Sequence, residues 1–147
     1  MLKNKKLGFI GGGNMAEALI KGLVAASFFD SKSIFVSEPS KSKRDALYTK
    51  YKIKTTDDNV ELGKKCDILI FAVKPQVLKE VLRDIRSVVG SDKLVISVAA
   101  GVPISIIDRV LRGDSEKKFS VVRTMPNTPS LVQEGVTAIA SGKHVSK

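Results

Sequence analysis

The segment Leu7–Ala16 constrains the fold of this chain more than any other. A short apolar run, Leu7 to Ile10, leads into Gly11-Gly12-Gly13-Asn14-Met15-Ala16, which has the pattern Gly-x-Gly-x-x-Ala. Apolar residues then recur at helical spacing, at Ala16, Leu19, Ile20, Leu23 and Val24. This order of strand, glycine turn and helix predicts a dinucleotide-binding unit, with an ordinary glycine turn as the alternative.

Each small residue of this turn has a separate physical role in the prediction. Gly11 lets the chain turn sharply off the strand, and Gly13 lets a pyrophosphate come close to the backbone. Ala16 is small enough for the helix to pack against the strand. The pyrophosphate then meets the free N–H groups and the positive dipole end of the helix.

The rest of the chain alternates apolar, β-branched runs with helix-length segments. We expect strands at residues 7–10, 33–36, 67–72, 93–98, 119–124 and 136–140, and a weak strand at 52–55. Helices are expected between the strands. Ser40 opens a helix over 40–51, and Asp57 or Asp58 caps the next one. Pro75 starts a helix whose apolar stripe stops by Gly90 and consists of Val77, Leu78, Val81, Leu82 and Ile85, and Pro103 starts a last helix that ends at Gly113 and Asp114. This alternation predicts an α/β, doubly wound, Rossmann-like fold with a mainly parallel sheet and helices on both faces.

Composition fits one ordinary globular domain over residues 1–147, with 43% hydrophobic and 27% charged residues. Cys66 is the one cysteine, so no intramolecular disulfide forms, and we expect an inert thiol beside a buried strand. His144 lies in a polar tail without further ligands, so we expect no metal site. No apolar run approaches the ~20 residues that span a bilayer, and the basic N-terminus does not resemble a signal peptide. We therefore expect no membrane association and a cytoplasmic location.

The formal net charge of +10 raises the question of nucleic acid binding. The lysines are scattered along the chain, and aromatic residues, which make up only 5%, are not interleaved with them. We therefore expect a solvated basic surface and no nucleic acid partner. The charge would still steer an anionic cofactor and a carboxylate substrate towards the protein.

The segment Met125-Pro126-Asn127-Thr128-Pro129 has a different character. Its two prolines fix φ and remove backbone donors, which excludes a helix interior or a central strand. We expect a rigid loop at the carboxyl end of a strand, the edge at which open parallel sheets bind ligands.

Several motifs together resemble pyrroline-5-carboxylate reductase, a family that makes proline from 1-pyrroline-5-carboxylate with a reduced nicotinamide cofactor. The matching segments occur in family order over nearly the whole chain, and they are Gly8–Ala16, Ala72-Val73-Lys74-Pro75, Ser97–Val102, Arg123–Pro129 and Glu134-Gly135. The first motif alone is generic, whereas the Ala-Val-Lys-Pro and Met-Pro-Asn-Thr-Pro segments together are specific.

The resemblance implies a role for each matching segment. The phosphate-binding turn would consist of Ile10, Gly11, Gly12, Gly13, Asn14 and Met15. Asn59 would lie near the adenosine, and the cofactor would be lined towards its nicotinamide end by Ala72, Val73, Lys74 and Pro75, then by Ala99, Ala100 and Gly101. Met125, Asn127 and Thr128 would lie close to the nicotinamide and the substrate. For Lys74, Ala99–Gly101 and the proline loop, the structural alternatives are a solvated lysine, close packing and a plain rigid turn.

The cofactor type depends on Glu38, which follows the second predicted strand in Ser37-Glu38-Pro39-Ser40-Lys41. An acidic group there hydrogen-bonds the ribose hydroxyls of NADH and repels the 2′-phosphate of NADPH. Ser37, Ser40 and Lys41 favour a phosphate instead, and Glu38 facing solvent is a further alternative. We expect both NADPH and NADH to bind.

The family also has a second, helical domain that forms the dimer and holds the substrate, and nothing in this sequence matches it. We therefore expect a cofactor-binding half whose homo-oligomer contacts and proton donor lie in that absent domain, and we name no catalytic residue. Two other functions stay open: a domain of another imine or β-hydroxyacid reductase, and a non-catalytic NAD(P)-sensing module. Fold alone does not separate them.

Overall fold

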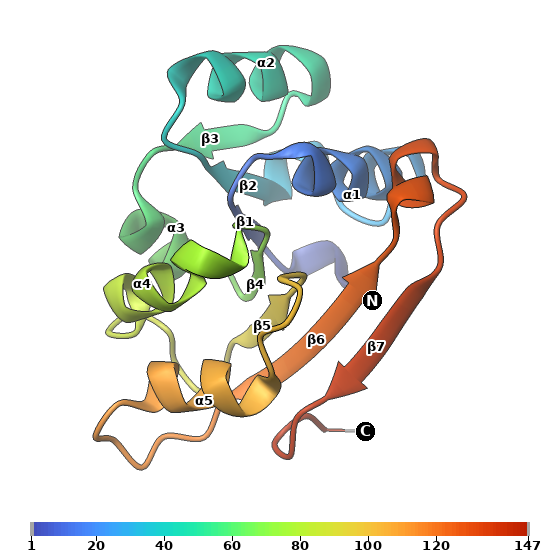
Figure 1. Cartoon of the computed structure of the whole chain (residues 1–147). Helices are drawn as coiled ribbons and strands as arrows, with labels where there is room; N and C mark the ends of the chain where they lie inside the picture. The colour runs from blue at the N-terminus through green and yellow to red at the C-terminus, as the bar shows by residue number, and fades with distance from the viewer. Residues whose placement is uncertain (1, 147) are drawn as a thin grey trace.

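The computed structural model describes residues 2–146, so the two end residues of the predicted domain, 1 and 147, lie outside the description. Seven strands form one sheet in the order β3-β2-β1-β4-β5-β6-β7 (Figure 1). The first six run parallel, and β7 pairs antiparallel with β6. The strands are β1 Leu7–Ile10, β2 Ile34–Ser37, β3 Lys54–Thr56, β4 Ile68–Phe71, β5 Leu94–Ser97, β6 Ser120–Pro126 and β7 Thr137–Ser141.

Helices connect consecutive parallel strands, as the alternation predicts. The α-helices are α1 Asn14–Ala25, α2 Lys41–Tyr51, α3 Asn59–Lys65, α4 Pro75–Ile85 and α5 Ile104–Arg112. Short 3₁₀ helices lie at η1 Leu2–Asn4, η2 Ser31–Ser33 and η3 Thr128–Val132. None of the helices in residues 2–146 is long and apolar enough to cross a membrane.

Two apolar layers cover the two faces of the sheet. Alternate strand residues point to opposite faces, so Leu69 and Phe71 of β4 enter one layer, while Ile68 and Ile70 enter the other. Helices α3, α4 and α5 cover the first face, and α1 and α2 cover the second. In Figure 1 the sheet passes between α1 and the group α3, α4 and α5. This arrangement confirms the predicted doubly wound, Rossmann-like fold.

The strand and helix predictions are correct to within a few residues, with three local corrections. The weak strand lies at Lys54–Thr56, because Lys52 is in the left-handed conformation (φ 57°) at the end of α2. Helix α4 ends at Ile85, well before Gly90. Val77 is 42% exposed and so lies outside the buried stripe of that helix.

The predicted loop at Met125–Pro129 needs a larger correction. Met125 and Pro126 continue strand β6, and Thr128 and Pro129 begin η3. The pairing of β6 with β5 stops at Arg123, so from there β6 has only β7 as a neighbour. A proline fits in such a one-sided stretch because no donor is needed on the open side.

Candidate functional site

The glycine turn follows β1, the strand at which the strand order of the sheet reverses, and β1 lies between β2 and β4. Gly11 has φ +100°, and a Cβ there would lie 2.5 Å from the carbonyl oxygen of Ala72, so only glycine fits on both counts. The Gly11 N–H donates to the oxygen of Ser37 (2.8 Å), and the Ala72 N–H donates to the oxygen of Ile10 (2.8 Å). The turn is therefore fixed against the carboxyl ends of both neighbouring strands.

The start of α1 offers unpaired backbone donors beside open space. Gly13 is the N-cap, no side chain caps it, and a Cβ there would meet nothing within 4 Å. The first helical bond from this cap is Glu17 N–H to Gly13 oxygen (3.0 Å). In residues 2–146 the N–H groups of Asn14, Met15 and Ala16 have no acceptor. Such a helix start binds anions, so the geometry fits the pyrophosphate of a dinucleotide.

Glu38 follows β2 and is turned inwards, with only 7% of its surface exposed. Its carboxylate accepts from the N–H of Gly12 (3.0 Å) and from the N–H of Ser40 (3.0 Å). The alternative that Glu38 faces solvent is therefore wrong. The carboxylate instead joins the glycine turn to the start of α2, and both of its oxygens are engaged by the protein backbone.

The loop that carries Glu38 is braced by Arg44, a residue that sequence reasoning missed. The Arg44 guanidinium donates to the carbonyl oxygens of Glu38 (2.7 Å) and Pro39 (2.9 Å), and it pairs with Asp57 at 3.4 Å. The sequence carried a signal for this contact: Arg44 lies one helical turn after the helix start at Ser40, and so close to the loop of Glu38 and Pro39. The Ser40 hydroxyl contacts that of Ser42 (3.0 Å).

Asn59 begins α3, directly after β3, at the same edge of the sheet as the glycine turn. Asp58 is the cap of this helix and accepts from the N–H groups of Val60 (2.8 Å) and Glu61 (2.9 Å). This settles the choice between Asp57 and Asp58. It also holds Asn59 in a defined first turn on the side of β2 and β3.

The segment Ala72–Pro75 follows β4 and contacts the glycine turn through Ala72. Ala72 and Val73 are half-buried, whereas Lys74 and Pro75 are exposed. Lys74 is the N-cap of α4, and Pro75 occupies the first turn of that helix, as predicted. The Lys74 backbone is thus fixed at the carboxyl edge of the sheet while its ammonium group stays accessible.

The segment Ala99–Gly101 follows β5 at the same edge. Ala99 is buried, and its N–H donates to the Ser97 hydroxyl (3.3 Å). Ala100 and Gly101 are exposed. Gly101 has φ +73°, and a Cβ there would meet nothing within 4 Å. The backbone here borders open space, which a flat ring requires for close approach.

Some of the residues predicted to lie near the substrate have structural roles. The Asn127 side-chain oxygen accepts from the Val136 N–H (3.0 Å), so it closes the connection between β6 and β7. Met125 is 41% exposed on β6, and Thr128 starts η3, which contacts α1. Arg123, to which sequence reasoning gave no separate role, has a buried Nε atom without a hydrogen-bond partner among the described residues.

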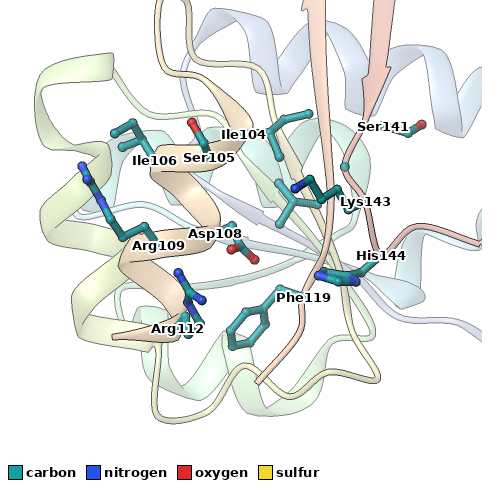
Figure 2. Close-up of a pocket in the computed structure, with 12 residues that line it drawn as sticks. Ile104, Ser105, Ile106, Asp108, Arg109, Arg112, Phe119, Ser141, Lys143 and His144 are labelled. Atoms are coloured by element: carbon teal, nitrogen blue, oxygen red, sulfur yellow. The ribbon is translucent and has the colours of Figure 1, made fainter. Parts of the chain in front are cut away.

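Other groups lie away from this edge. A cavity of about 520 Å³ lies between α5, the start of β6 and the residues after β7, and Phe119, Arg109 and His144 are among its lining (Figure 2). Burial raises the pKa of the Cys66 thiol to about 12, which fits the predicted inert thiol. In the described part of the chain, no group of three or more His, Cys, Asp or Glu residues is placed to hold a metal ion.

Comparison with known proteins gives consistent matches. A pyrroline-5-carboxylate reductase of Vibrio alginolyticus is 36% identical over 99% of this chain and 52% of its own length. The structure of a pyrroline-5-carboxylate reductase from Coxiella burnetii matches with a TM-score of 0.90 and 36% identity, over 97% of this chain and 52% of that one. The structure of pyrroline carboxylate reductase from Plasmodium falciparum, solved with NADP bound, matches with a TM-score of 0.83 and 34% identity, over 98% of this chain and 50% of that one.

The chain thus spans about half the length of the curated relatives that it matches. Residues 6–101 match the model of a family described as NADP oxidoreductase, coenzyme F420-dependent. This match runs from the strand before the glycine turn to Gly101 and so includes most of the carboxyl edge described above. The chain belongs to this family of NADP oxidoreductases.

Proposed function

We propose that this chain is the cofactor-binding half of a pyrroline-5-carboxylate reductase, which reduces 1-pyrroline-5-carboxylate to L-proline with NADPH or NADH. The observation that carries the proposal is the match, over nearly the whole chain, to reductases of that name, one of them solved with NADP bound. The unpaired donors and open space at the start of α1 supply the physical counterpart.

The residues of the carboxyl edge divide the work of binding. The N–H groups of Asn14 and Met15, with the space beside Gly13, receive the pyrophosphate. Asn59 serves the adenosine side, and the exposed ammonium group of Lys74 adds positive charge along the same edge. The backbone at Ala99–Gly101 borders the nicotinamide. Met125 and Thr128 lie towards the substrate.

The bound cofactor supplies a hydride for the carbon of a C=N bond, and the protein supplies orientation and electrostatics. His144 lines a cavity at the start of β6, and Tyr48 and Tyr51 lie on α2, so these residues are not at the carboxyl edge. We therefore assign no proton donor within residues 2–146. The proton donor and the remaining substrate contacts belong to the helical half implied by the resemblance. The contacts of a homo-oligomer belong to the same half. The proposed location is cytoplasmic.

Glu38 sets the balance between the two cofactors in this proposal. Its buried negative charge lies between the glycine turn and the start of α2, where the ribose of the adenosine would bind. It disfavours a 2′-phosphate there, although Ser40 and Lys41 attract one. Glu38→Ser should shift the ratio of affinities towards NADPH by about tenfold, the equivalent of about 1.4 kcal/mol. An unchanged ratio would remove Glu38 from cofactor selection.

The experiment is to measure the oxidation of NADPH and NADH by this chain with 1-pyrroline-5-carboxylate present. The chain alone should bind cofactor without turnover. Adding the separately produced helical half of a related reductase should restore turnover. Turnover by the chain alone would contradict the division into two halves, and a failure to bind either cofactor would contradict the proposal as a whole.

A second candidate function, a non-catalytic NAD(P)-sensing module, is favoured by one observation, the lack of a His or Tyr side chain at the carboxyl edge in the described residues. It predicts cofactor binding with no gain of activity when the helical half is added. Another imine or β-hydroxyacid reductase would instead show turnover with a different substrate.

A further inference from the structure

Four cationic side chains line one cavity between α4 and α5. The cavity has a volume of about 270 Å³, and Lys79, Arg83 and Arg86 border it from α4 and its end, while Arg109 borders it from α5. Val110 and Gly113 complete the lining, which includes no Asp or Glu among the residues that the structure describes. The lining of this cavity is therefore positively charged.

None of the four cations of this cavity forms an ion pair with a residue that the structure describes. Five ion pairs occur within residues 2–146, and each involves a cation outside the cavity. Like charges one turn apart on a helix repel each other, as Lys79 and Arg83 do on α4. The helix dipole favours Arg83 and Arg109, which lie in last turns. It does not explain Lys79, in the middle of α4, or the convergence of cations from two helices.

The packing of the two helices fixes this convergence. Leu82 and Ile85 of α4 and Ile107 of α5 are fully buried in the same apolar layer. Gly113 ends α5 with φ +56°, and a Cβ there would lie 2.9 Å from the Arg86 Nη1 atom, so the Arg86 guanidinium lies over the end of α5. Figure 2 shows the Arg109 side chain pointing away from Phe119 and His144. Arg109 borders the larger cavity as well, so it contributes to the lining of both cavities.

We infer that this cluster of Lys79, Arg83, Arg86 and Arg109 is a second anion site, which binds a phosphate group. Guanidinium groups pair with phosphate oxygens through two parallel N–H bonds, and a lysine adds a point charge. The site is separate from the proposed cofactor site, because α4 starts at the carboxyl edge with Pro75 and runs away from it towards Arg83 and Arg86. The ligand is either an inorganic phosphate or the phosphate of a nucleotide.

The test is a calorimetric titration of inorganic pyrophosphate into the chain saturated with NADPH, so that the glycine turn is occupied. Binding of pyrophosphate should be measurable in the wild type. It should weaken by at least about tenfold in Arg83→Glu/Arg109→Glu, because two cations that pair with the phosphate are replaced by anions that repel it. All four cations are exposed, so the variant should keep its fold, which far-ultraviolet circular dichroism and urea unfolding check. The milder pair Arg83→Gln/Arg109→Gln should show a smaller loss.

The control is Lys117→Glu/Lys118→Glu, which changes the net charge equally at exposed positions outside this cavity. Its affinity should stay within about twofold of the wild type, as screened, distant charges imply. An equal loss in both double variants, no loss in either, or no binding to the wild type would each overturn the inference. Binding of a DNA duplex but not of pyrophosphate would overturn it in favour of a nucleic acid surface. Titrations with ATP and with adenosine then separate the two sources of the phosphate. Measurable binding of adenosine identifies a nucleotide, whereas binding of ATP and pyrophosphate without binding of adenosine identifies recognition of the phosphate alone.

Discussion

The centre of the sheet and its β7 edge have opposite environments. Every residue of β1, β2 and β4 is buried, whereas every residue of β7 is exposed. Leu69 of β4 has no accessible surface, while Ile139 of β7 is 70% exposed. Both strands are apolar and paired, so strand formation is not the difference. The difference is that helices cover both faces at the centre, and at β7 neither face is covered.

This contrast separates what the chain completes by itself from what it leaves open. The glycine turn and the segments after β4 and β5 rest on the covered strands, which fix their backbone. Near the C-terminus the apolar side chains of Val132, Val136 and Ile139 are 67–74% exposed. Such surface is typical of interaction sites.

The largest effect should come from truncating one side chain in each region. Leu69→Ala should lower the free energy of unfolding by about 2–5 kcal/mol, because it leaves a cavity in the core. Ile139→Ala should change it by less than about 0.5 kcal/mol, because its side chain already faces solvent. Urea unfolding measures both, and similar losses in the two variants would contradict the contrast.

A smaller effect separates two glycines with positive φ at the carboxyl edge. Gly11→Ala should cost about 2 kcal/mol or more, because backbone strain adds to a clash with the Ala72 carbonyl. Gly101→Ala should cost about 1 kcal/mol, since it carries the strain but meets no neighbouring atom. Thermal and urea unfolding test the difference. Equal costs would mean that the turn is not fixed against β4.

Sequence reasoning located the sheet centre well because its signals are local. The apolar runs around Phe9 and Leu69, the turn at Gly11–Gly13 and the cap at Asp58 each act within a few residues. The orientation of Glu38 could not be predicted, because it depends on a donor 26 residues away, the Gly12 N–H. The extension of β6 through Pro126 was missed for a similar reason: it depends on β7 pairing on one side only.

A still smaller effect compares two helix caps. Asp58→Ala should lower the free energy of unfolding by about 1 kcal/mol, because its side chain accepts two N–H groups at the start of α3. Ser40→Ala should have almost no effect, because the Ser40 side chain caps no backbone donor of α2. Urea midpoints of the two variants measure this, and the reverse order would contradict the cap assignment.

The smallest effect concerns Cys66, at the edge of the covered core. Its pKa is raised to about 12 in the folded chain, against about 8.5 when unfolded, so folding favours the neutral thiol. The stabilisation is complete below the unfolded pKa and is lost as the pH rises from about 8.5 towards 12, a loss of less than about 1 kcal/mol at pH 9. Alkylation at pH 8 should be slow without urea and fast with it, and fast alkylation of the folded chain would contradict burial.

The most direct test of the account is a titration of NADPH and NADH into the wild type and into Gly13→Val. Gly13 has φ −78°, and a Cβ there would meet no atom within 4 Å, so the variant should keep its stability. The wild type should bind both cofactors. The variant should lose at least about tenfold in affinity, because the added side chain fills the space of the pyrophosphate. Equal binding by both proteins would contradict a cofactor site at the start of α1.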